Sequence, residues 1–152
     1  MSKRLTASGV LYTSGYKVGT SGYTIADDYL QTMIQKSPDK IPVVADFSKG
    51  FLHDPNNLIG YATMKYVEPR DPYPGYIRAT IVFNNRSEKT YYQLLESSKD
   101  RVSLHLGFYM TRVKFRSEDN QLRNGIISAI ALGKDCLGGL IDKFGWEDTD
   151  DG

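Results

Sequence analysis

Hydrophobic and polar positions fall into short patterned stretches along the chain, and most of these patterns predict β-strands. Apolar residues alternate with polar ones over residues 3–12 and again over 102–106, which is the period of a strand with one buried face. Residues 41–47, 58–67 and 125–132 are largely apolar on both faces, so we expect strands covered on two sides.

Short turns join several of these predicted strands. Prolines crowd residues 68–75, between the stretch 58–67 and a further strand at 75–84, and predict an antiparallel hairpin. Gly107 separates the strand at 102–106 from a second strand that is expected to reach Phe115. At such a glycine we expect a bulge, a tight bend or a close backbone approach.

Helical spacing of apolar residues predicts two helices, and a third short helix is expected near the end of the chain. Thr24 can cap the first helix, and Asn85 and Glu88 have the spacing of a capping box for the second. The three predicted helices cover residues 24–37, 85–98 and 136–144.

These elements predict an α+β fold with a mainly antiparallel β-sheet or small β-barrel and two to three peripheral helices. At 152 residues the chain fits a single domain, which we place at residues 1–146. The acidic stretch at 147–152 is expected to form a mobile or partner-docking tail.

Composition narrows the classes of function. The net charge of +1 argues against a nucleic-acid partner, because phosphate neutralisation needs a concentrated basic surface. The chain has one cysteine, Cys136, which excludes an intrachain disulfide and fits a reducing compartment. We expect the Cys136 side chain to be a small buried apolar group. No apolar run is long enough for a signal peptide or a membrane span, so we expect no membrane association.

Candidate chemistry centres on one serine and two histidines. Ser103 and His105 share a strand face but lie about 7 Å apart, too far for a direct hydrogen bond. His53 lies in a polar loop beside Asp54 and is a displaced candidate base for Ser103. Neither a phosphate-binding glycine loop nor zinc-ligand spacing is present, so we expect no cofactor and no metal.

The order of motifs resembles a known family over roughly residues 5–140. The chain has a Pro-Val-aliphatic strand at 42–44, Ile59-Gly60, the helical pattern Tyr-x-x-Leu-Leu at 91–95, and Val-Ser-x-x-Leu-Gly-Phe at 102–108. This series resembles the prohead maturation proteases of tailed bacteriophages, which are related to the herpesvirus assemblins. The resemblance implies a prohead protease-like fold.

The same resemblance implies a serine nucleophile, a histidine base and a third residue that orients the histidine. The position of the base falls on Phe47 or Asp46, and that of the nucleophile on His105 or Leu104. The third position falls on Ser128 or an aliphatic neighbour. Three departures together imply that the scaffold is kept and the catalytic residues are lost.

We therefore expect a structural, capsid-associated protein of a tailed phage, a decoration or minor head protein located in the virion after synthesis in the bacterial cytoplasm. Its expected partners are the major capsid protein or other head proteins, with a homo-oligomer as a further option. The alternative is an active maturation serine protease that cleaves scaffold and capsid precursors, with Ser103 as nucleophile and His53 or His105 as base. A third option is a domain that binds another protein partner through this fold.

Overall fold

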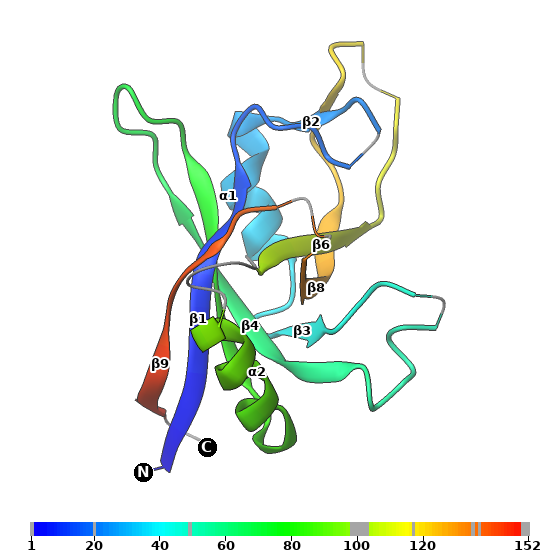
Figure 1. Ribbon diagram of the computed structural model, residues 1–152. Coiled ribbons are helices and arrows are strands. Elements are labelled where there is room, and N and C mark those ends of the chain that lie inside the picture. Colours follow the sequence, from blue (N-terminus) through cyan, green and yellow to red (C-terminus); the bar gives the residue numbers. More distant parts are fainter. Residues whose placement is uncertain are drawn as a thin grey trace.

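A seven-stranded sheet forms the body of the molecule, with the order β6-β8-β3-β4-β5-β1-β9 (Figure 1). The computed structural model describes residues 2–19, 21–48, 50–97, 104–116, 118–134, 136 and 138–149. Neighbouring strands are antiparallel except for the parallel pair β3 and β8, so the expected α+β fold with a mainly antiparallel sheet is confirmed. The strands of this sheet are β1 (Ser2–Thr13), β3 (Ile41–Val44), β4 (Leu58–Val67), β5 (Tyr76–Phe83), β6 (His105–Thr111), β8 (Ile126–Gly133) and β9 (Ile141–Thr149).

The remaining elements are two helices and a small parallel sheet. β2 (Thr24–Ile25) pairs with β7 (Gln121–Leu122). α1 (Asp27–Lys36) lies near the end of β1, where Ser14 Oγ donates to Asp27 Oδ1. α2 (Asn85–Ser97) lies near the start of β1 (Figure 1). None of the described helices is long and apolar enough to cross a membrane.

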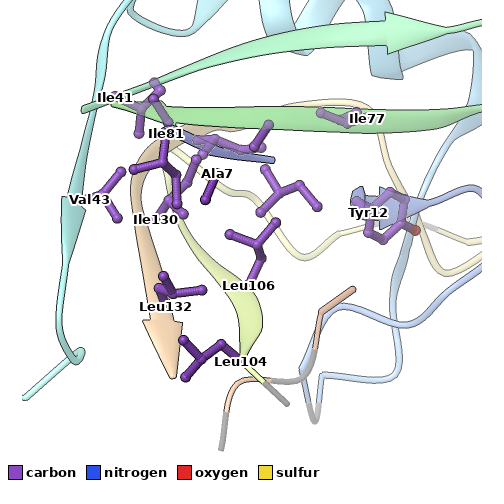
Figure 2. Packing of buried hydrophobic residues seen from close by; sticks show 14 of the residues in the cluster. Ala7, Tyr12, Ile41, Val43, Ile77, Ile81, Leu104, Leu106, Ile130 and Leu132 are labelled. Carbon is purple, nitrogen blue, oxygen red and sulfur yellow. The ribbon is translucent and has the colours of Figure 1, made fainter. Parts of the chain in front are cut away.

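The alternating pattern places one face of each strand in a common core. In β5, Ile77, Ala79 and Ile81 are fully buried, whereas Thr80 between them is exposed. Figure 2 shows side chains from β1, β3, β5, β6 and β8 gathered in this cluster. Both helices add buried residues to it, so the described chain shares one hydrophobic core.

A double glycine lets the end of the chain pass between β1 and β6. A Cβ on Gly139 would lie 2.1 Å from the Val10 carbonyl oxygen, and one on Gly138 would lie 2.1 Å from that of Leu106. The Leu106 N–H donates to Gly139 O at 2.8 Å. Only residues without a side chain fit so narrow a gap, after which the chain turns into β9 along β1.

Both predicted helix caps are wrong, by two residues at α1, where Ala26 is the cap, and by one residue at α2. Thr24 belongs to β2 and pairs with Gln121, so that α1 begins at Asp27. At α2 the Ser87 N–H donates to Asn84 Oδ1 at 3.1 Å, so Asn84 caps the helix. Glu88 does not complete a capping box, because its carboxylate accepts the Leu5 N–H at 2.8 Å and ties α2 to β1.

Two further expectations near the end of the chain are corrected. The helix expected at 136–144 is absent from the described residues, because Ile141–Thr149 forms β9 along β1. Residues 147–149 of the expected tail continue this strand and pair with residues 2–4 of β1. Earlier in the chain, β6 runs through Gly107 as a single strand and ends at Thr111, so the second strand expected up to Phe115 does not form.

Candidate functional site

A cavity of about 790 Å³ opens where β1, β3, β6 and β8 come together. Its lining comes from the end of β1, the loop at 16–19, residues 45–47 after β3, residues 107–108 of β6, and the end of β8 with the glycine-rich segment that follows it. Cavities of this volume hold small molecules or short peptide segments in many proteins.

One wall of the cavity is formed by the end of β1 and the loop that follows it. Tyr12 fixes this wall through hydrogen bonds and ring packing. Its hydroxyl donates to Tyr16 O at 2.5 Å and accepts the Ile25 N–H at 2.9 Å. Its ring packs edge-on against Phe108 with the centroids 5.9 Å apart. Burial raises the pKa of the Tyr12 hydroxyl above its usual value, although the hydrogen bond from Ile25 opposes this, so the phenol remains neutral and holds the loop as a donor.

Phe47 lines the adjacent wall of the cavity and belongs to an aromatic cluster. Phe47 lies edge-on to Phe51 at 5.2 Å between centroids, and Tyr109 of β6 lies 6.1 Å from Phe47 and 5.2 Å from Phe51. A Cβ on Gly107 would lie 3.6 Å from the Phe47 ring and 3.2 Å from Cys136 Sγ. The glycine thus allows Phe47 and Cys136 to pack over the backbone of β6.

The charged residues of the cavity are Lys17, Asp46 and Lys134, which are all exposed. Hydrogen bonds from the Ser48 hydroxyl and the Ser48 N–H lower the pKa of the Asp46 carboxyl, so it is anionic at neutral pH. Buried Asn57 fixes this loop, because its amide donates to Asp46 O at 2.9 Å and to Phe51 O at 3.2 Å. An apolar interior with a charged rim suits ligand binding better than acid–base chemistry.

The residues at the three family positions do not converge. Phe47 packs over Gly107, two residues from His105 on β6. Ser128 lies five residues before Gly133, the partner of His105 in the ladder, which is about 17 Å along β8. The Ser128 hydroxyl instead shares a hydrogen bond of 2.5 Å with Thr111 Oγ1.

Neither histidine is among the described residues that line the cavity. His105 Nδ1 lies 3.0 Å from Gly138 O, and because a carbonyl oxygen only accepts, Nδ1 is the donor. His53 is exposed in the loop before β4, where its backbone N–H donates to Gly50 O. Ser103 lies outside the described residues. The described residues that line the cavity include no serine.

Sequence reasoning missed the cavity, because its walls come from segments that are far apart along the chain. Cys136 was expected to be a buried side chain but is half-buried and lines the cavity. The density of glycines at 133–139 was the one usable signal, since glycines mark close backbone approaches. Within the described part of the chain, no group of three His, Cys, Asp or Glu side chains could hold a metal ion.

Comparisons with protein-family models, with curated proteins and with solved structures found no match for this chain.

Proposed function

We propose that the chain is a structural, capsid-associated protein of a tailed phage, a decoration or minor head protein that uses a protease-like scaffold without proteolysis. The observation that carries this proposal is the environment of Phe47. The sequence resemblance puts the histidine base at Phe47 or Asp46. The Phe47 ring packs against Phe51 and Tyr109, and Asp46 is an exposed carboxylate at the cavity, so neither position carries an imidazole. A phenyl group cannot accept a proton from a serine hydroxyl.

The hydrogen bonds of the other two positions support the same proposal. His105 uses Nδ1 to hold the Gly138 carbonyl, and Ser128 is bonded to Thr111 at a distant part of the sheet. Each residue therefore has a structural role that does not depend on a substrate.

Exposed aromatic residues support a role in binding a protein partner. Tyr109 lies beside the cavity and is 43% exposed. Tyr16 lines the cavity and is 65% exposed. Aromatic rings of this kind are enriched at protein interfaces, because they bury a large area at a small cost in side-chain entropy. We assign the head proteins of the same phage as partners, the major capsid protein first.

Quantitative mass spectrometry of purified mature virions tests the structural role. The expected result is recovery of this chain in a fixed ratio to the major capsid protein across preparations. Its loss from mature particles would contradict the proposal, because a maturation protease is removed or destroyed once it has acted.

A cleavage assay tests the alternative, a serine protease with Ser103 as nucleophile. The purified chain is incubated with the capsid and scaffold precursors of its own phage, beside Ser103→Ala and the control Ser97→Ala. Ser97 is an exposed serine near the end of α2, whose hydroxyl donates to Leu94 O. We expect no cleavage by any of the three proteins; cleavage that is lost in Ser103→Ala alone would establish the protease instead.

A further inference from the structure

β9 is one of the two edge strands of the seven-stranded sheet. It pairs with β1 over residues 2–9 and, among the described residues, with no strand on its other side (Figure 1). The outward N–H and C=O groups of such a strand are free to pair with another extended segment. At nine residues, β9 is longer than most edge strands that proteins leave unprotected.

Position 145, at the centre of β9, does not require a glycine for any contact within one chain. A Cβ there would meet no atom within 4 Å, and its φ is not in the left-handed region. By contrast, a Cβ on Gly9 would lie 2.2 Å from Leu140 O, just before β9, and a Cβ on Gly60 would lie 2.4 Å from Val82 O of β5. A glycine on an open strand edge fits the close approach of a backbone from outside the chain.

The residues that flank Gly145 would face favourable partners if β9 paired antiparallel with a second copy of itself. If two copies of β9 pair antiparallel about Gly145, Lys143 lies opposite Glu147 and Phe144 lies opposite Trp146. These are an opposite-charge pair and an aromatic pair, and the two-fold axis makes each of them twice. Lys143 is 73% exposed and Glu147 is 51% exposed, so both side chains can turn to a partner.

This register also places two like charges, Asp142 and Asp148, opposite one another. Nearby cations in the same chain reduce this repulsion. Asp142 already forms an ion pair with Arg78 of its own chain. Asp148 lies opposite Lys3 in the ladder between β1 and β9. The irregularity in that ladder between Ser8 and Gly9 also bends β9 beyond Lys143, which confines regular pairing to residues 143–147.

We propose that the chain forms a homodimer in which β9 pairs antiparallel with β9 of a second copy about Gly145, joining the two sheets into one. Pairing over so few residues buries less surface than a permanent dimer needs, so the association is reversible and concentration-dependent. The partner is a second copy of this chain, since the charge pattern is complementary to its own reverse.

The tryptophan at the interface provides the first test. Trp146 is the one tryptophan of the chain and is 44% exposed. Its emission should shift to shorter wavelength as the protein concentration rises from about 1 to 500 μM, in step with the rise in sedimentation-average mass from 17.1 kDa towards twice that value. A monomer without an emission shift throughout this range would overturn the proposal.

Charge reversal then tests the register. Lys143→Glu and Glu147→Lys each place like charges opposite one another at two places, so each variant alone should dimerise at least about tenfold more weakly. An equimolar mixture of the two should dimerise as the wild type does, because every opposing pair is then of opposite charge.

This mixture also separates pairing between chains from pairing within one. Lys143 and Glu147 lie 3.9 Å apart in the same chain, and both variants lose that contact, alone or mixed. Recovery in the mixture therefore reports contact between copies. A dimer that persists unchanged in both single variants would place the interface elsewhere and overturn the proposal.

Discussion

Gly139→Ala places a methyl group in the narrowest backbone passage described, between β1 and β6. The new Cβ would lie 2.1 Å from Val10 O and 3.0 Å from Val10 C. Since both atoms belong to the backbone of a paired strand, no side-chain rotation can relieve the contact. The segment must move by about 1 Å, and the hydrogen bond from Leu106 N–H to Gly139 O then lengthens from 2.8 Å.

The magnitude follows from these two effects. Overpacking of a fixed site costs about 1–3 kcal/mol. Loss of a backbone hydrogen bond adds about 1 kcal/mol. We therefore expect Gly139→Ala to lower the free energy of unfolding by about 3 kcal/mol, a large fraction of the 5–15 kcal/mol that is typical of a domain.

Urea denaturation followed by circular dichroism measures this change, at a few micromolar so that the chain is monomeric. The matched control is Gly145→Ala, where the added Cβ meets nothing within 4 Å. Replacing this glycine should leave stability unchanged or raise it by about 0.5 kcal/mol, because the unfolded chain loses freedom. If Gly139→Ala were destabilised by less than about 1 kcal/mol, the close passage between β1 and β6 would be wrong.

Two further predictions concern hydrogen bonds of the fold and of the cavity rim. Ser37→Ala should cost about 1–3 kcal/mol in thermal unfolding, because buried Ser37 Oγ accepts the N–H of fully buried Ile127 at 3.1 Å. The exposed control Ser97→Ala should change stability by less than about 0.5 kcal/mol, and equal effects of the two would refute the role of Ser37. Carbon-13 NMR titration should show the pKa of Asp46 below that of an ordinary aspartate, and Ser48→Ala should raise it. Because the folded-state pKa is depressed, the contribution of Asp46 to stability is present above the unfolded-state pKa and is lost as the pH falls through the folded-state value. A pKa that does not change in Ser48→Ala would contradict this cause.

Local patterns predicted the bounds of those strands whose own residues give a strong apolar signal. The strand expected at 58–67 is β4, and the apolar run at 125–132 differs from β8 by one residue at each end. β8 is apolar along most of its length and is mostly buried. The expectation that 58–67 is covered on two sides is wrong, because Tyr61, Thr63 and Lys65 on one face of β4 are exposed.

Elements that depend on distant partners were predicted less well. Asn84 rather than Asn85 caps α2 because Glu88 is drawn away by the Leu5 N–H and by Arg4 Nε at 3.4 Å. β9 contains Gly145 and several charged residues, which gives it a weak strand pattern. It forms because residues 2–9 of β1 are available beside it.

His105 has a structural role of its own in the described chain. Its Nδ1–H holds Gly138 O, and the next residue, Leu106, donates its N–H to Gly139 O. These two hydrogen bonds fix the double glycine between β1 and β6, and this placement both closes one wall of the cavity and directs the chain into β9. A serine at position 105 has too short a side chain to span the same gap, so the hydroxyl that the resemblance expects would leave this segment with one anchor fewer. His105 therefore helps to hold in place the edge strand through which we propose two copies pair.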